Sequence, residues 1–134
     1  MRVLVVEPEV LPYEKEINGL EEMQATVGGL IDAIYPWEDL AAIVCNDEAI
    51  LLDMPFNRSV EGGYGGVFGT FFVCGVGEED FCSLTPEQMK VYKEKFRRAE
   101  ILLGVRGNEL VTLKVPARPK EPPQRPPKRR EPER

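Results

Sequence analysis

Histidine is absent from the 134 residues, and the glycine-rich stretch 61–69 lacks the lysine that a phosphate loop requires. The three cysteines, Cys45, Cys74 and Cys82, form no C-x-x-C pair, so we expect neither a disulfide framework nor a zinc site. No stretch is long and apolar enough to cross a bilayer, and the N-terminus lacks a signal-peptide pattern. These absences favour a cytoplasmic protein without a metal or cofactor.

The sequence offers little for catalysis. Without histidine the usual general base is missing. Cys82, just before a predicted helix, is the one candidate nucleophile, and the sequence supplies no base partner for it. Glu78, Glu79 and Asp80 could hold Mg²⁺ or Ca²⁺, but consecutive carboxylates rarely converge on one ion, so a solvated loop is favoured. We therefore expect a protein that is not an enzyme.

Basic residues are scarce in the first two thirds of the chain. Residues 1–89 hold three basic and 17 acidic residues, a net charge of −14, whereas the whole chain carries −6. Such an acidic body repels nucleic-acid phosphate and attracts basic partners, although acidity can also serve solubility alone. Arg58 is the only basic residue between Lys15 and Lys90, and a structural ion pair is favoured over ligand recognition for it.

The apolar pattern predicts an α+β fold in one globular domain, residues 1–115. Short apolar runs predict strands over 2–7 and 13–17, followed by a helix, which gives a ββα start and a mixed sheet of the β-grasp or roll type. Further strands are predicted over 40–45, 49–52 and 70–76. The chain closes with a hairpin of residues 101–105 and 110–115 around a Gly-Asn turn.

The first of two main helices is predicted over residues 17–36, because six apolar residues fall on one side of a helix: Leu20, Met23, Val27, Leu30, Ile31 and Ile34. Gly28 and Gly29 interrupt it. Either the helix kinks or tolerates glycine there, or its outer face carries a notch that another backbone approaches. The candidate binding residues of this acidic notch are Glu21, Glu22, Ala25, Gly28, Gly29 and Asp32.

The second helix has the clearest start signal in the chain. Thr85 and Gln88 form a capping box around Pro86 at the first helical position. A basic stripe of Lys90, Lys93 and Arg97 follows on one face. We expect this helix to pack beside the first one and bring opposite charges together; alternatively, the stripe faces an acidic partner or RNA.

Residues 116–134 are expected to form a disordered tail rich in Pro, Arg and Lys. They include seven prolines and seven basic residues against three acidic ones, a composition that cannot bury enough apolar surface to fold. We expect weak contacts with the acidic body of the chain or with nucleic acid.

Several segments resemble a known family in order and spacing: MRVLVVEP, YEKEINGLEEMQATVGG, IYP, a Cys-Asn turn, PFNRS and GTFFVCGVGEEDFCSLTPEQMKVYKEKF. Over residues 1–96 the chain is similar to a domain-of-unknown-function family, number 3846, met in phages and conjugative elements of Gram-positive gut bacteria. The resemblance implies an origin in a mobile genetic element and supplies no catalytic residues.

These observations lead to the hypothesis of an acidic protein-binding module that occupies a basic host or element-encoded protein, for example as an inhibitor of a defence nuclease or DNA-binding protein. The alternative is a nucleic-acid-associated accessory protein that uses the basic stripe and the tail. A homo-oligomer formed through the glycine notch is a third possibility. We expect no contact with membranes.

Overall fold

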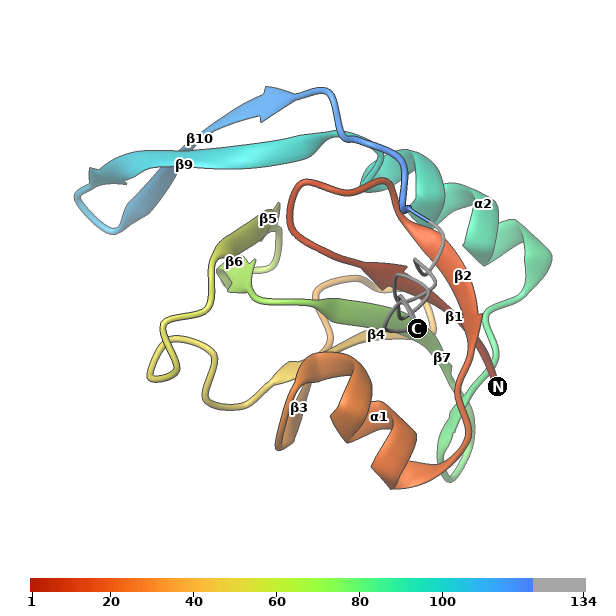
Figure 1. The fold of residues 1–134 in the computed structure, drawn as a ribbon. Coiled ribbons are helices and arrows are strands. Elements are labelled where there is room, and N and C mark those ends of the chain that lie inside the picture. Colours follow the sequence, from red (N-terminus) through yellow and green to blue (C-terminus); the bar gives the residue numbers. More distant parts are fainter. Residues whose placement is uncertain (122–134) are drawn as a thin grey trace, which may run out of the picture.

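The computed structural model describes residues 1–121 and shows an α+β fold with an antiparallel main sheet and a projecting C-terminal hairpin (Figure 1). The elements in chain order are β1 Arg2–Val6, β2 Tyr13–Glu16, α1 Gly19–Val27, β3 Ile31–Ile34, β4 Ala41–Asn46, β5 Phe56–Val60, β6 Gly65–Phe68, β7 Phe71–Val76, β8 Phe81–Cys82, α2 Pro86–Lys95, β9 Ala99–Arg106 and β10 Glu109–Val115. The predicted α+β class, its ββα start, its two helices and the closing hairpin are confirmed, whereas the main sheet is antiparallel and not mixed.

The main sheet has the strand order β2-β1-β7-β4-β3, and β8 adds to β7. Its three central strands, β1, β7 and β4, are apolar at almost every position, because both faces of the sheet are covered. Alternate residues therefore enter two different cores. Leu4, Ile43 and Val73 point to one core, and Val5, Val44 and Phe72 point to the other.

The two helices lie on opposite faces of this sheet. Val27 of α1 belongs to one core, whereas Met89 and Tyr92 of α2 belong to the other, together with Val60 and Val67 of the β5–β6 hairpin. The prediction that the helices pack side by side is therefore wrong. Each helix has only one apolar side to bury, and each face of the sheet takes one helix.

Helix α1 ends at Val27, not at residue 36. Gly28 adopts φ 84°, and the amides of Gly28 and Gly29 both donate to the carbonyl of Gln24, at 2.8 and 2.9 Å. A left-handed glycine after the last turn is a common helix C-cap. Ile31–Ile34 then pairs with β4 as an edge strand, and Leu20 and Leu30 of the predicted stripe are exposed.

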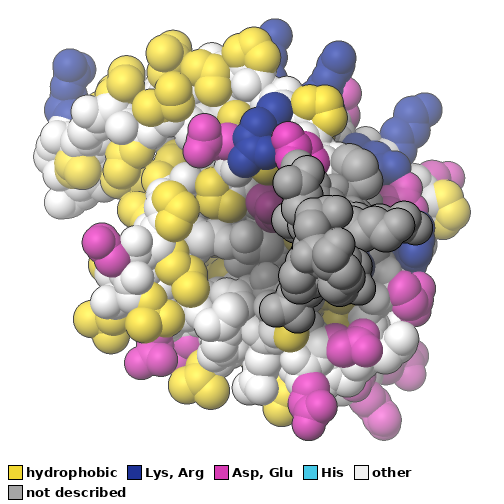
Figure 2. All heavy atoms as spheres, in the orientation of Figure 1, with side chains coloured by type: hydrophobic (Ala, Val, Ile, Leu, Met, Phe, Trp, Pro, Cys, Tyr) yellow, Lys and Arg dark blue, Asp and Glu magenta, His cyan; other side chains and the backbone are white. Residues whose placement is uncertain are grey.

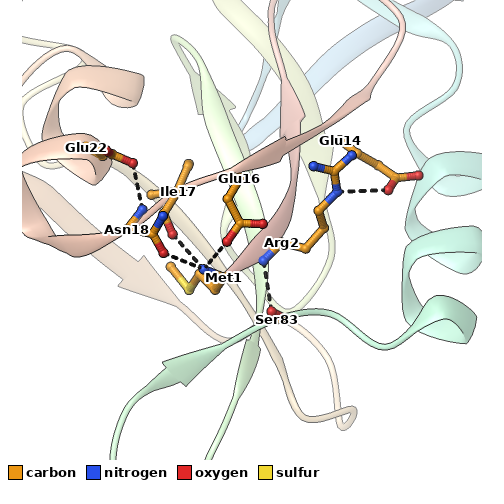
Figure 3. Close-up of polar contacts among 8 residues, drawn as sticks. All are labelled: Met1, Arg2, Glu14, Glu16, Ile17, Asn18, Glu22 and Ser83. Carbon is orange, nitrogen blue, oxygen red and sulfur yellow. Dashed lines mark hydrogen bonds and ion pairs between the residues drawn. The ribbon is translucent and has the colours of Figure 1, made fainter.

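The start of the chain is bound to the entry of α1 (Figure 3). The α-amino group of Met1 donates to Glu16 Oε2 and the Ile17 carbonyl, each at 2.8 Å, and to Asn18 Oδ1 at 3.0 Å. Asn18 holds the N-cap position of α1, but its side chain is bonded to Met1 and makes no cap hydrogen bond. The amide of Arg2 donates to Ser83 Oγ at 2.8 Å, which ties β1 to the segment that leads into α2.

The predicted capping box of α2 is confirmed. The Gln88 amide donates to Thr85 Oγ1 at 3.0 Å, and the Thr85 amide donates to Gln88 Oε1 at 3.0 Å. Asp39, just before β4, accepts a hydrogen bond from the Tyr92 hydroxyl at 2.7 Å and further bonds from Gln88. These bonds hold α2 over the sheet.

The first residues of the predicted tail are packed on the domain. Arg118 donates its amide to the Glu9 carbonyl at 3.0 Å, and its own carbonyl accepts from the Leu11 amide at 2.8 Å. Lys120 Nζ lies 2.7 Å from Glu7 Oε2. Residues 122–134 of the predicted tail lie outside the described residues. Neither of the helices in residues 1–121 has the length and apolar character that a membrane-spanning helix needs.

Candidate functional site

The turn 47–53 exposes three consecutive aliphatic side chains. Ile50, Leu51 and Leu52 are 74%, 83% and 54% exposed. We predicted residues 49–52 as a strand, and that prediction is wrong: the backbone folds on itself, with the Leu52 amide donating to the Glu48 carbonyl at 2.9 Å. The turn thus presents apolar side chains to solvent instead of hiding them in a sheet.

A groove of about 220 Å³ separates this turn from the β5–β6 hairpin. Its walls are mainly apolar side chains and glycine: Ile34, Cys45, Ala49, Ile50, Leu51, Tyr64, Gly66, Val67 and Phe68. Asn46, Asp47 and Glu48 complete the lining at the head of the turn. We call this the turn groove. An open apolar groove of this kind is typical of a site that holds side chains of another molecule.

Carboxylates lie at one end of the turn groove and on the elements next to it. Asp47 and Glu48 line it directly, and Asp53 ends the turn. Asp32 lies on the edge strand β3 opposite Cys45, whose thiol points to the Asp32 carbonyl at 3.7 Å. All four carboxylates belong to residues that are exposed, so they remain available to cations. The apolar groove therefore has an acidic rim.

The thiol on the groove wall is not a nucleophile at neutral pH. Burial, together with the negative charges of Asp32 and Asp47, raises the pKa of Cys45 to about 11. Burial likewise raises the pKa of Cys74 to about 12. Both thiols stay protonated, so Cys45 contributes a small apolar surface to the groove.

Asn46 fixes the turn groove to the end of α1. Its side-chain amide donates to the Val27 carbonyl at 3.2 Å, and its Oδ1 accepts from the Glu48 amide at 2.7 Å. Gly29 leaves room for this side chain, because a Cβ at Gly29 would lie only 3.0 Å from Asn46 Nδ2. A segment of the same chain therefore fills the space beside the glycine pair.

The predicted notch on a helix surface does not exist. Glu21, Glu22 and Ala25 are exposed on α1, but Gly28 and Gly29 form the turn after it. Asp32 belongs to β3 and contributes to the rim of the turn groove instead. The structure thus places only Asp32 of the six predicted residues at the groove.

Arg58 is completely buried and has no carboxylate partner among the described residues. Its guanidinium donates to the carbonyls of Phe96 and Val10, at 3.0 and 2.8 Å, and to Asn57 Oδ1 at 2.8 Å. Burial lowers the pKa of Arg58 to about 10, and the charge of Glu100 offsets part of this effect. The predicted ion pair is replaced by a set of carbonyl contacts that joins three segments, and no ligand can reach the guanidinium.

Two of the three residues of the basic stripe form ion pairs with carboxylates of the same chain. Lys93 pairs with Glu14 on β2, and Arg97 Nη1 lies 3.8 Å from Glu94 Oε2. Arg97 follows α2, which ends at Lys95, so it is not part of the helix face. The expected meeting of basic helix and acidic body occurs, but at β2 and not at α1. Lys90 is exposed on α2.

The acidic loop is exposed at all three carboxylates, Glu78, Glu79 and Asp80. No group of three or more potential ligands that could hold a metal ion occurs within residues 1–121. Cys82, the candidate nucleophile, is exposed on β8.

The exposed aliphatics Ile50, Leu51 and Leu52 were missed as functional candidates. The run AILL alone suits a buried strand. The signal against a strand is its flanks, because Asn46-Asp47-Glu48 precedes the run and Asp53-Met54-Pro55 follows it. Acidic and turn-forming residues on both sides of a four-residue run indicate a loop that displays it.

The family model described as a domain of unknown function (DUF3846) matches residues 1–97, nearly three quarters of the chain. The comparisons of this chain with curated proteins and with solved structures found no match.

Proposed function

Because the chain belongs to the DUF3846 family, whose description names no activity, we propose a function from the geometry of its surface: it is a non-enzymatic protein-binding module. The turn groove is its binding surface. The observation that carries this proposal is the exposed set Ile50, Leu51 and Leu52 beside an apolar groove with an acidic rim. Exposed apolar surface with a polar rim is typical of protein interaction sites.

The chemistry of the groove favours a basic partner. Aliphatic side chains of the partner would enter the groove, and its lysines or arginines would meet Asp32, Asp47, Glu48 and Asp53. The excess of acidic residues over the first 89 positions adds long-range attraction for the same partner. The apolar contacts then supply the larger part of the affinity, since exposed ion pairs contribute little.

We further propose that the protein comes from a phage or conjugative element and acts in the cytoplasm on a host or element-encoded protein. Defence nucleases and other DNA-binding proteins present cationic surfaces to phosphate. An acidic module that covers such a surface would inhibit it. The resemblance of residues 1–96 to the family and the acidity of this region support this proposal.

Affinity capture tests the module. The full chain, a Leu51→Glu variant and a Leu40→Glu control are immobilised and incubated with a Gram-positive lysate at physiological salt, and bound proteins are identified by mass spectrometry. Leu40 is 68% exposed at the opposite end of β4, so both variants add the same charge at an exposed leucine. We expect a basic protein to be captured by the wild type and the control and lost with Leu51→Glu. Equal capture by all three proteins would contradict the proposal.

The alternative, nucleic-acid association through the basic stripe and the tail, predicts a different result. Binding would weaken steeply with salt and disappear when the tail, residues 116–134, is deleted, while Leu51→Glu would have no effect. The pairing of Lys93 and Arg97 with carboxylates of the same chain disfavours a role for the stripe.

A further inference from the structure

The outer face of the β9–β10 hairpin is the second exposed apolar surface of the chain. Ile101 and Leu113 are paired across the two strands, and Val111 lies on the same face two residues before Leu113. A bulge opposite Val111 adds Leu103 to this face. These four residues are between 37% and 62% exposed. Monomeric proteins rarely expose so many neighbouring aliphatic side chains without a partner.

The hairpin and the body carry opposite charge. Residues 1–96 contain six basic and 18 acidic residues, a net charge of −12, whereas residues 97–115 contain four basic and two acidic ones. One of those two, Glu100, is buried and accepts hydrogen bonds from Ser59 and Thr112. The exposed charges of the hairpin region are therefore mostly positive.

This hairpin has the chemistry that the turn groove requires of a partner, because it is apolar and basic. Its outer face cannot occupy the turn groove of the same chain. Its inner side lies on the start of β6, where Leu110 Cδ1 would be 3.0 Å from a Cβ at Gly66. The outer face consequently points away from the body and is available to another molecule.

Both surfaces lie on the same side of the protein. Figure 1 shows the hairpin tip and the segment that leads into β5 projecting in one direction, and Figure 2 shows hydrophobic side chains gathered over both regions. Two copies related by a two-fold axis on that side could place each hairpin against the turn groove of the other. Such a reciprocal contact is closed, so it stops at two copies.

We propose that the partner of the turn groove includes a second copy of this chain, which seats the outer face of its β9–β10 hairpin in the groove and receives the opposite hairpin in return. This inference rests on the proposed function of the groove and names one occupant for it. The hairpin follows the residues 1–97 that match the family, so one half of the proposed contact lies outside that match and the other half, the turn groove, lies within it.

Sedimentation velocity on the full chain, at protein concentrations between about 1 and 500 µM, tests the reciprocal dimer. This concentration range covers the dissociation constants of weak protein interfaces. We expect a concentration-dependent dimer. Leu103→Glu in the hairpin and Leu51→Glu in the groove should each weaken dimerisation at least about tenfold, because each places a charge in both copies of a desolvated contact. The Leu40→Glu control should dimerise like the wild type.

Mixing the two variants distinguishes this arrangement from others. A Leu103→Glu chain keeps an intact groove and a Leu51→Glu chain keeps an intact hairpin, so the mixture retains one of the two contacts. We expect the mixture to form more dimer than either variant alone. A dimer that ignores Leu51→Glu, or a mixture without recovery, would overturn the reciprocal contact.

A wild-type chain that stays monomeric throughout would also overturn this inference. It would leave the proposed function standing if the lysate experiment still yields a basic protein that Leu51→Glu releases. Conversely, a reciprocal dimer without any captured partner would support the self-association and contradict the host-directed role.

Discussion

Arg58 and Phe96 meet at the end of α2, where Nε and Nη2 of the arginine both donate to the Phe96 carbonyl, at 3.2 and 3.0 Å. The last carbonyls of a helix have no partner within the helix and carry partial negative charge. The buried guanidinium satisfies the Phe96 carbonyl and holds the point at which the chain leaves α2 toward β9. The position of the hairpin therefore depends on an arginine of β5.

Replacement of Arg58 should destabilise the fold strongly. In Arg58→Lys the single ammonium cannot reach the three carbonyl and amide acceptors that the planar fork serves, and buried acceptors are left unpaired. We expect a loss of roughly 3 kcal/mol in the free energy of unfolding, measured by urea denaturation. Arg98→Lys, at an exposed position, is the control and should change it by less than about 0.5 kcal/mol. Equal effects of the two changes would contradict this assignment.

The Asp39 carboxylate should make the free energy of unfolding depend on pH in the acidic range. Hydrogen bonds from Tyr92 and Gln88 hold the pKa of Asp39 below its usual value, although partial burial opposes them. A carboxyl whose pKa is lower in the folded state stabilises the protein above its unfolded pKa, about 3.9, and this contribution is lost as the pH falls through the folded pKa. Asp39→Asn should therefore cost less than about 1 kcal/mol at pH 7, because solvent screens this exposed carboxylate, and the difference from wild type should shrink below about pH 4.

Thermal unfolding of Asp39→Asn and Glu38→Gln between pH 2.5 and 7 checks this expectation. Glu38 is the exposed neighbour, so its substitution should be neutral throughout. A constant difference between Asp39→Asn and wild type over the whole range would show that the carboxylate charge is not involved.

Gly28 should resist substitution because of its backbone conformation. Its φ of 84° lies in the left-handed region, and a Cβ there would lie 3.4 Å from Met54 Cε. Gly28→Ala should cost roughly 1 kcal/mol. Gly104 offers the matched control, since its φ is not positive and nothing lies within 4 Å of an added Cβ. Gly104→Ala should leave the urea midpoint unchanged or raise it; a loss as large as that of Gly28→Ala would argue against a conformational cause.

Residues 116–121 should stabilise the domain. The Arg118 backbone bonds to Glu9 and Leu11, and the Lys120 side chain pairs with Glu7. Burial raises the pKa of Glu7, but the bonds from Lys120 and Tyr13 outweigh it and bring the pKa below its usual value. A chain ending at residue 115 should be less stable than one ending at 121 by about 1 to 2 kcal/mol, as calorimetry would show. Identical melting curves would mean that this segment adds nothing.

The sequence was informative where local and global signals agree. The uninterrupted apolar runs of β1 and β7 could only be buried on both faces, and the capping box fixes the start of α2 without any tertiary contact. The Gly-Asn turn likewise determined the closing hairpin. These elements could be predicted because each carries its own stop and start residues.

Other features depended on distant partners. Residues 28–34 fit a helical stripe equally well, but pairing of Ile31–Ile34 with β4 and the left-handed Gly28 end the helix. Leu51 is exposed because residues 47–53 form a turn. The residue before this turn, Asn46, is fixed by a hydrogen bond to the Val27 carbonyl, which lies 19 residues away in the sequence. The partners of Arg58 come from three segments of the chain, so the one-dimensional pattern could not identify them. The turn groove is formed by such long-range contacts and was therefore missed.

Site-specific photocrosslinking tests the central claim most directly. A photoreactive phenylalanine analogue is placed at Leu51 in the turn groove, or at Leu40 or Val91 as exposed controls, in a Gram-positive host that produces the full chain. The account predicts adducts at Leu51 with a basic host protein, with the hairpin of a second copy, or with both, and few adducts at the two controls. If Leu51 gives no more adduct than Leu40 and Val91, the turn groove is not the binding surface of this protein.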